Sequence, residues 1–247
     1  MFSQTAELYD AIYGSFRDNA AEAAAIAALV RAIQPGAHRI LDVGCATGEH
    51  AKHLRMSHGF AVDGLDLDHV LLSVARRKVP DAQFFEADMS NFELPGRYDV
   101  VMCLFSSIGY LKTIDRVIAA WRCFRHHLSA NGVILVEPWF PPGVLCEGPR
   151  STERIDAYGV CVERTSDVVI TGNLSSLRFT YRIEDHDGVR TAHEVHELGL
   201  FTDRELLSSF RSAGLVATRS VAGATGRGLY IARPESHQSA WSRRGHT

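Results

Sequence analysis

The residues best placed for chemistry form a glycine-containing turn near the start of the chain. The run Asp42-Val43-Gly44-Cys45-Ala46-Thr47-Gly48 follows the apolar pair Ile40-Leu41 and leads into a segment with helical character. When a strand of a parallel sheet ends in such a turn, ligands bind in the crevice at that edge of the sheet. Gly44 and Gly48 would let the backbone approach a nucleoside or amino-acid group, because a Cβ there would occupy ligand space. Asp42, just before the turn, can accept hydrogen bonds from an ammonium group.

Acidic residues follow two further predicted strands, at the positions where each strand ends. The run Gly64-Leu65-Asp66-Leu67-Asp68 ends the second strand, and an acid there can accept both hydroxyl groups of a ribose. Asp66 is the better candidate, because Asp68 is placed to cap the helix that follows. After the third strand, the run Glu86-Ala87-Asp88-Met89 offers a carboxylate to an adenine amino group and an apolar side chain to the face of the ring. Together these residues predict a nucleoside-containing ligand across the strand ends.

A dinucleotide-binding oxidoreductase is the main alternative for such an arrangement. Its fingerprint requires Gly-x-Gly-x-x-Gly around a pyrophosphate. Here Ala46 occupies the position of the middle glycine, and Gly48 follows directly after Thr47. Glycine turns and strand-end acids each occur in many α/β proteins, but their ordered combination is far more specific and disfavours the dinucleotide fold.

The elements that must position these residues alternate along the first 140 positions. Short apolar strands are expected at residues 39–43, 61–65, 82–85, 99–103 and 133–137, with helical stretches between them. Such βαβ repetition predicts a mainly parallel sheet covered by helices. Ahead of the first strand, an alanine-rich helix is expected from Asp18 to Ile33 and a shorter helix from Glu7 to Tyr13.

The character of the sequence changes after Pro142-Gly143. Residues 151–201 are rich in Val, Thr and Ile, and they are divided by Thr171-Gly172-Asn173 and Asp185-His186-Asp187-Gly188. This pattern predicts antiparallel strands joined by tight turns. Helix signals return at Thr202, where an acidic residue three positions later completes a capping pattern. Two last strands are expected at residues 215–221 and 228–232.

The expected fold class is therefore α/β, with a Rossmann-like sheet and an inserted antiparallel β sheet. Four parts are expected along the chain. They are N-terminal helices at residues 1–34, a ligand-binding domain at 35–148 and 201–234, the antiparallel β insertion at 149–200, and a polar, disordered tail at 235–247.

Composition and charge narrow the classes of partner and location. The chain has 247 residues, 46% hydrophobic and 22% charged, with a formal net charge of -3. It carries no basic stripe, so nucleic acid is not expected as a partner. The first residues lack the features of a signal peptide, and no apolar run approaches the ~20 residues that span a bilayer. A cytoplasmic protein without a membrane partner is therefore expected.

No metal site is expected from the cysteines or the histidines. The five cysteines are scattered and show no C-x-x-C spacing. The run His193-Glu194-Val195-His196-Glu197 is not H-E-x-x-H, because its second histidine arrives one position early.

Two sets of residues carry a resemblance to known enzymes. The pattern from Leu41 to His50, taken with Asp66 and Asp88-Met89, resembles the cofactor motifs of class I S-adenosylmethionine-dependent methyltransferases. Through nearly the whole chain, further stretches are similar to the TDP-3-amino-sugar N,N-dimethyltransferases of the desosamine and mycaminose pathways. Those stretches are Ala6-Glu7-Leu8-Tyr9-Asp10, Ala21-Glu22-Ala23-Ala24, Cys103-Leu104-Phe105-Ser106-Ser107-Ile108-Gly109, Val136-Glu137-Pro138-Trp139, Leu200-Phe201 and Gly226-Arg227-Gly228-Leu229.

The resemblance implies S-adenosylmethionine as the cofactor, a seven-stranded class I methyltransferase sheet and a β cap over a small-molecule acceptor, in a homodimer. It places Ser107 and Tyr110 toward the acceptor and Arg227 at the diphosphate of a nucleotide-linked sugar, where a guanidinium can form paired hydrogen bonds. A loop arginine in water is the alternative for Arg227. The expected cofactor contacts, from motifs and resemblance together, are Tyr9, Tyr13, Asp42, Gly44, Cys45, Ala46, Thr47, Gly48, His50, Asp66, Leu67, Ala87, Asp88, Met89, Leu104, Phe105 and Ser106.

Three positions depart from the sugar enzymes. Tyr110 stands where they carry a histidine, Asp18-Asn19 where they carry Asp-Tyr, and Trp139-Phe140 where they carry paired tryptophans. Trp139 is still expected to touch the acceptor. The leading function is N-methylation of an amino group on a small metabolite, with a nucleotide-linked aminosugar as its specific form. One alternative is an enzyme that methylates another acceptor, such as an amino acid, a phenol or a carbon nucleophile. The other is a cofactor-binding regulatory protein without catalysis.

Methyl transfer from a sulfonium requires alignment of the nucleophile and exclusion of water, and an amine acceptor must be neutral. Tyr110 can orient the amine, although a pKa of about 10 makes tyrosine a poor base at neutral pH. Histidine is a better base at neutral pH, because its unperturbed pKa is about 6.5, so His193 and His196 are further candidates. Strand alternation puts them on opposite faces, so at most one points into a site. A surface or structural role is the alternative for both. Tyr9 and Tyr13, at helical i, i+4 spacing, form either an aromatic lid over the sulfonium or part of the core.

Overall fold

A seven-stranded sheet forms the centre of the computed structural model, which describes residues 6–150, 152–157, 159–220 and 227–235. Its strand order is β11-β12-β5-β4-β1-β2-β3. Strands β3, β2, β1, β4 and β5 pair in parallel, and β12 pairs antiparallel with both β5 and β11. The strands are β1 (Arg39–Val43), β2 (Ala61–Asp66), β3 (Phe84–Glu86), β4 (Tyr98–Cys103), β5 (Leu128–Val136), β11 (Leu215–Ser220) and β12 (Leu229–Pro234).

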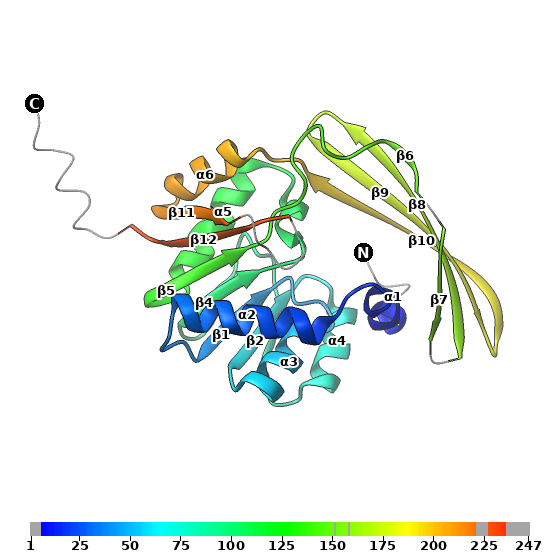
Figure 1. Cartoon of the computed structure of the whole chain (residues 1–247), viewed down its shortest axis with the longest axis horizontal. Helices are drawn as coiled ribbons and strands as arrows, with labels where there is room; N and C mark the ends of the chain where they lie inside the picture. Colours follow the sequence, from blue (N-terminus) through cyan, green and yellow to red (C-terminus); the bar gives the residue numbers. More distant parts are fainter. Residues whose placement is uncertain (1–5, 151, 158, 221–226, 236–247) are drawn as a thin grey trace, which may run out of the picture.

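Helices cover both faces of this sheet (Figure 1). Alternation along β1 sends Leu41 into one apolar cluster, with Trp121 of α5 and Phe210 of α6, and sends Ile40 into the other, with Leu54 of α3. Helices α2 and α4 join α3 on that second face. The helices are α2 (Asn19–Ile33), α3 (Glu49–His58), α4 (His69–Lys78), α5 (Ile114–His126) and α6 (Asp203–Ser212), and a 3-10 helix, η2 (Ser107–Leu111), follows β4.

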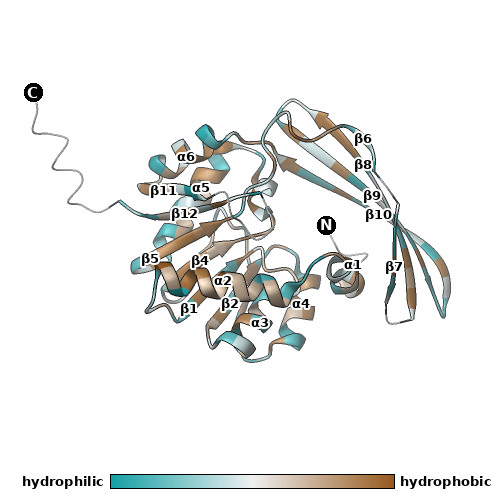
Figure 2. Ribbon diagram, viewed as in Figure 1, coloured by the Kyte–Doolittle hydropathy of each residue, from teal (hydrophilic) through white to brown (hydrophobic). Residues whose placement is uncertain are grey.

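A second, antiparallel sheet stands beside the core and is inserted between β5 and α6 (Figure 1). Its order is β10-β9-β8-β6, with β7 also paired to β8. The strands are β6 (Gly148–Pro149), β7 (Glu153–Ala157), β8 (Val160–Thr171), β9 (Leu174–Asp185) and β10 (Gly188–Gly199). Figure 2 shows brown concentrated in the strands of the core sheet, whereas teal and brown mix along the second sheet. That mixture is typical of a sheet with one packed face and one solvated face. We call this second sheet the cap.

A short N-terminal helix connects the two sheets. The 3-10 turn η1 (Ala6–Leu8) leads into α1 (Tyr9–Gly14). Ile12 packs with Ile155 and Tyr181 of the cap, while Tyr9 and Tyr13 pack against the cluster that contains Leu71 of α4. The cap therefore contacts the core through α1 as well as through the polypeptide links at its ends.

The fold class predicted from the sequence is confirmed, and the element positions agree closely. The N-cap at Asp18, the capping box at Thr202 and Glu205 and both predicted cap turns are present. Strand β5 begins at Leu128, five residues earlier than expected, because it continues through Gly132. Part of the predicted tail, residues 236–247, lies outside the described residues. The division into domains stays a prediction.

No helix among the described residues is long and apolar enough to cross a membrane.

Candidate active site

A cavity of about 830 Å³ lies between the carboxyl edge of the core sheet, α1 and the cap. Its volume is in the range of ligand pockets. A smaller cavity of about 50 Å³ lies around the glycine turn, and six residues line both: Tyr9, Tyr13, Gly44, Ala46, Phe105 and Ser107. The two therefore adjoin, and the loop after β1 forms the shared wall.

The glycine turn has the left-handed backbone expected for ligand approach, but its Cβ positions face protein atoms. Gly44 has φ +76°, and a Cβ there would lie 2.7 Å from Ser107 Oγ. A Cβ on Gly48 would lie 3.2 Å from Phe84, and Gly48 lines neither cavity. The expectation that both glycines clear ligand space is therefore not supported for Gly48, which is the N-cap of α3 and lines neither cavity, whereas Gly44 lines both. Gly44 instead allows η2 to pack closely against the turn.

Asp42 has a buried oxygen without a partner. It is 2% exposed, lines the smaller cavity, and its Oδ2 makes no hydrogen bond. Burial raises the pKa of Asp42 to about 6. A buried acceptor left without a donor costs stability, and an ammonium group in the smaller cavity would satisfy it. This arrangement fits the predicted contact with the α-ammonium group of a bound amino-acid moiety.

Asp66 holds the glycine turn in place. Its Oδ2 accepts from the backbone N–H of Ala46 and its Oδ1 from that of Asp68, both at 2.9 Å. Burial raises the pKa of Asp66 despite these hydrogen bonds. Asp66 also lines the main cavity, so further lone pairs of the same oxygens can serve ribose hydroxyls. Asp68 caps α4 through the N–H groups of Val70 and Leu71, as predicted.

The predicted adenine contacts lie together on the main cavity. Leu67, Ala87, Asp88 and Met89 all line it. Asp88 Oδ2 accepts from Arg116 Nη2 at 2.6 Å and Oδ1 accepts from Ser90 Oγ at 2.7 Å. Although partial burial would raise the pKa of Asp88, these hydrogen bonds lower it.

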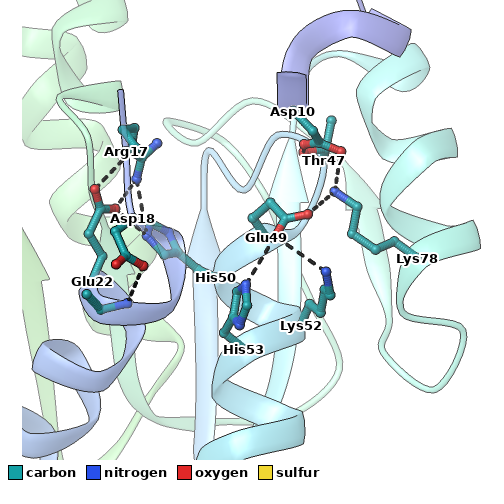
Figure 3. Close-up of polar contacts among 11 residues, drawn as sticks. Asp10, Arg17, Asp18, Glu22, Thr47, Glu49, His50, Lys52, His53 and Lys78 are labelled. Carbon is teal, nitrogen blue, oxygen red and sulfur yellow. Dashed lines mark hydrogen bonds and ion pairs between the residues drawn. The ribbon is translucent and has the colours of Figure 1, made fainter. Parts of the chain in front are cut away.

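The predicted tyrosine pair stands over both cavities and is held against the core. Tyr9 and Tyr13 stack with ring centroids 4.4 Å apart, and Tyr13 meets Phe105 edge-on at 5.9 Å. Between them in sequence, Asp10 accepts from the hydroxyl of Thr47, and Lys78 pairs with both Asp10 and Glu49 (Figure 3). These ion pairs attach the helix to the glycine turn, in the position of a lid, although Tyr13 also packs toward the cap.

A second polar cluster surrounds Arg17, which lines the smaller cavity, and Figure 3 shows its contacts. Arg17 pairs with Glu22 and its guanidinium lies 3.8 Å from the centre of the Phe105 ring. His50 Nε2 lies 3.2 Å from the Glu22 carboxylate. Burial alone would raise the pKa of Glu22, but the hydrogen bonds from His50 and Arg17 lower it to about 2. Sequence reasoning identified His50 but missed Arg17, whose only signal is its place just before the cap of α2.

The segment after β4 is strained where it meets the cavity. Phe105 and Ser106 have φ +49° and +65°, a region that side chains other than glycine rarely adopt. Buried Glu137 accepts from the Phe105 N–H at 2.8 Å and so helps to hold this conformation. Strain of this kind is common at functional sites. Glu137 was not identified as a site residue from the sequence, although it follows a buried strand.

Three further predicted cofactor contacts on these loops line only the smaller cavity, and Ser106, like Gly48, lines neither. Leu104, Cys45 and Thr47 line the smaller cavity. Ser106 is 1% exposed and donates to the carbonyl of Pro138 at 2.7 Å. Its expected contact with the cofactor is therefore not supported by its position, because its left-handed backbone turns the side chain into the protein.

The predicted acceptor residues also border the main cavity. Ser107, Tyr110, Trp139 and Arg227 all line it. Trp139 Nε1 donates to Ser175 of the cap at 2.9 Å. Arg227 lies over the rings of Phe105, Trp139 and Phe140 at 5.1 to 5.4 Å, and its buried Nε has no hydrogen-bond partner. Burial lowers the pKa of Arg227. The alternative of a loop arginine in water is wrong for this side chain.

The two cap histidines face in opposite directions, as strand alternation predicted. His196 is 2% exposed, lines the cavity, and its Nδ1 lies 2.9 Å from the hydroxyl of Tyr110. His193 is exposed and its Nδ1 lies 3.1 Å from Thr180 Oγ1. His193 is therefore not placed for the catalytic role considered from the sequence, because it lies on the outer face of β10.

The cavity can hold a nucleoside along the strand ends and a second molecule under the cap. Carboxylates line its first part, and aromatic rings, a buried imidazole and arginines line its second part. Such a site suits group transfer between two bound molecules with water largely excluded.

Comparison with known proteins identifies the family. A family model described as a methyltransferase domain matches residues 40–132. The chain is 38% identical over 231 residues to the dTDP-3-amino-3,4,6-trideoxy-alpha-D-glucopyranose N,N-dimethyltransferase of Streptomyces venezuelae, covering 93% of this chain and 97% of that protein.

Two solved structures are similar over almost the whole chain. The crystal structure of Streptomyces venezuelae DesVI has a TM-score of 0.87 and 38% identity, covering 93% of this chain and 98% of that one. The S-adenosylmethionine-bound amino pentose methyltransferase of Micromonospora echinaspora, involved in calicheamicin biosynthesis, has a TM-score of 0.81 and 32% identity, covering 91% and 95%.

Proposed function

This chain belongs to the S-adenosylmethionine-dependent sugar N-methyltransferases, and on that premise we propose that it methylates the amino group of a nucleotide-linked amino sugar under the cap. The name of the relative from Streptomyces venezuelae describes an enzyme that methylates such an acceptor. The alternative of a regulatory protein without catalysis is set aside by the family.

The observation that carries this proposal is the single cavity that both halves of the site line. Asp66 and Asp88 of the core and His196 and Leu177 of the cap border the same 830 Å³. A donor and an acceptor can therefore meet without domain closure, and a volume of about 830 Å³ leaves room for more than an amino-acid-sized molecule.

The residues of the core fit S-adenosylmethionine. The unpartnered Oδ2 of Asp42 would accept from its α-ammonium group, Asp66 would hold the ribose, and Asp88 with Met89 the adenine. Tyr9 and Tyr13 would cover the positively charged sulfur, since aromatic faces attract cations. When bound, the cofactor supplies a methyl group already activated for in-line displacement.

The residues of the acceptor side would position the amino sugar. Ser107 and Tyr110 offer hydroxyl groups near the glycine turn, where the amine must lie. Arg227 would bind the diphosphate, because its buried Nε has a free donor and guanidinium groups bind phosphate through paired hydrogen bonds. Holding the amine in line with the methyl group is the main task of these residues.

Calorimetry and turnover test the proposal together. We expect S-adenosylhomocysteine to bind at micromolar concentration and nucleotide-linked amino sugars to be methylated in a panel that also contains amino acids and phenols. Cofactor binding with turnover of a phenol or amino acid alone would overturn the acceptor assignment. Absence of binding would contradict the predicted cofactor residues.

Two further parts of the proposal concern the molecule as a whole. We propose a cytoplasmic enzyme, since its five cysteines, among the described residues, form no disulfide. We also propose the homodimer that the resemblance implies. Light scattering of the purified chain tests the dimer, because a mass near 27.3 kDa would indicate a monomer.

A further inference from the structure

The acceptor wall contains a buried chain of hydrogen bonds that starts at the cavity and ends inside the cap. The hydroxyl of Tyr110 lies 2.9 Å from His196 Nδ1, and His196 Nε2 lies 3.4 Å from Glu194 Oε2. Tyr110 and His196 line the cavity. His196 and Glu194 are 2% and 4% exposed. These hydrogen bonds therefore link the cavity to a carboxylate that is largely shielded from water.

The chemistry of the three groups gives these hydrogen bonds a direction. A carboxylate only accepts, so His196 Nε2 carries the proton that faces Glu194, and Nδ1 must then accept from the hydroxyl of Tyr110. Tyr181 also donates to Glu194 Oε2, at 3.2 Å. The oxygen of Tyr110 keeps a lone pair that can accept a hydrogen bond from a group in the cavity.

We propose that Tyr110, His196 and Glu194 form a proton relay that converts the bound acceptor from an ammonium to a neutral amine; this proposal rests on the amine acceptor proposed above. The ammonium passes one N–H proton to the oxygen of Tyr110 as the phenolic proton passes to His196 Nδ1. The amine nitrogen recovers its lone pair, Tyr110 is again a phenol, and the resulting imidazolium faces the Glu194 carboxylate. After the product leaves, the same path returns the proton to the solvent.

Tyr110 conducts the proton in this scheme and does not act as the base. Burial holds the pKa of the Tyr110 hydroxyl well above its usual range, and the nearby Tyr13, Asp66 and Glu194 act in the same direction. His196 is the group that ends with the proton, and an imidazole is suited to this at neutral pH.

The surroundings of His196 contain few other charges. The ring of Phe179 packs edge-on against it at 5.4 Å. Arg164, which lies over Phe179, already pairs with Glu153, and Lys112 of the η2 end pairs with Glu197 on β10. Among the described residues, the buried phenols Tyr13 and Tyr181 and the carboxylate of Asp66 also lie near the relay. Glu194 is thus the carboxylate that directly faces the imidazole.

The pH dependence of turnover distinguishes a relay from a contact that only fixes the cap. In His196→Gln the amide can keep hydrogen bonds to Tyr110 and Glu194 but cannot take up a proton. With the amino-sugar acceptor, we expect kcat to fall on the order of 100-fold at pH 7. The deficit should shrink as the pH rises and the acceptor arrives as free amine. His193→Gln, on the outer face of the same strand, should match the wild type throughout.

A reduction of the same size at every pH, with raised KM, would show that His196 only shapes the pocket and would overturn the relay. Tyr110→Phe should reproduce the pH-dependent loss, because the path is cut at its first member. Calorimetry with S-adenosylhomocysteine should give the same affinity for all variants.

A second measurement does not depend on turnover. Nitrogen NMR of the complex with S-adenosylhomocysteine, with His196 assigned by its loss in His196→Gln, should show the proton on Nε2. Tyr110→Phe should shift the Nδ1 resonance. Finding the proton on Nδ1 would overturn the relay even if amines are methylated. If the wild type methylates no amine at all, the proposed function is overturned, and the NMR assignment of the His196 proton is unaffected.

Discussion

The hydroxyl of Thr47 donates to the carboxylate of Asp10, so α1, the proposed lid, is tied directly to the glycine turn. The other oxygen of Asp10 pairs with Lys78 of α4 at 2.6 Å, and Lys78 also pairs with Glu49 of α3 at 2.6 Å. One carboxylate therefore connects α1 to the glycine turn and to the last residue of α4.

Loss of this tie should loosen cofactor binding. In Asp10→Ala, Thr47 and Lys78 lose their shared acceptor, and we expect S-adenosylhomocysteine to bind about 1 kcal/mol more weakly, chiefly through faster dissociation. Calorimetry measures the affinity, and stopped-flow fluorescence measures the dissociation rate. Lys52→Ala is the matched control, because Lys52 pairs with Glu49 at the surface of α3; equal losses in the two variants would argue against a lid.

The buried carboxylate of Asp42 should make cofactor affinity depend on pH. Burial raises its pKa to about 6, so below that pH the group is neutral and attracts an ammonium weakly. Affinity for S-adenosylhomocysteine should therefore strengthen as the pH rises through about 6, by up to tenfold per unit on the acid side. Asp42→Asn should bind weakly with a flat profile, and a profile parallel to the wild type would contradict the assignment.

Asp66 should contribute to both the cofactor and the fold. Removing its carboxylate in Asp66→Ala takes an acceptor from Ala46 and Asp68 and from the ribose, so we expect ~1–3 kcal/mol weaker cofactor binding and a similar loss in the free energy of unfolding. Urea unfolding without ligand and calorimetry separate the two. Asp68→Ala should cost ~1 kcal/mol of stability through its helix cap with cofactor affinity unchanged.

Arg227 should act on the acceptor alone. Arg227→Lys keeps the charge but loses the paired donors, so the KM for the nucleotide sugar should rise roughly tenfold or more while S-adenosylhomocysteine affinity stays the same. Steady-state kinetics with the acceptor varied measures this. Arg182→Ala serves as the control, since Arg182 pairs with Glu184 at the exposed surface of β9 and does not line the cavity. An unchanged KM in the Arg227 variant would remove the diphosphate contact from the proposal.

Local signals made most of the fold predictable from the sequence. Thr202 caps a helix and Gly172 forms a turn through contacts with residues close in sequence, and both are where the sequence placed them. The strand-end acids were found for the same reason, because a parallel sheet brings the ends of its strands to one edge.

The rest of the site depends on contacts between distant segments. Arg17 reaches Phe105, and Glu137 holds the Phe105 backbone, across separations that no local pattern encodes. Alternation predicted that one cap histidine points inward, but only the packing of β10 against η2 decides that it is His196. The expectations for Ser106 and Gly48 failed because both residues have a left-handed backbone, which local sequence patterns did not reveal.

The insertion of the cap between β5 and α6 puts His196 and Glu194 of the proposed relay in a different segment of the chain from the carboxylates proposed for the methyl donor. Every carboxylate proposed for the methyl donor precedes residue 90, whereas the cap that closes over the acceptor is one uninterrupted stretch from residue 148 to 199. That stretch can change by substitution, or be exchanged with that of a related enzyme, without altering the cofactor residues. Such a division allows one ancestral donor site to evolve toward many amine acceptors.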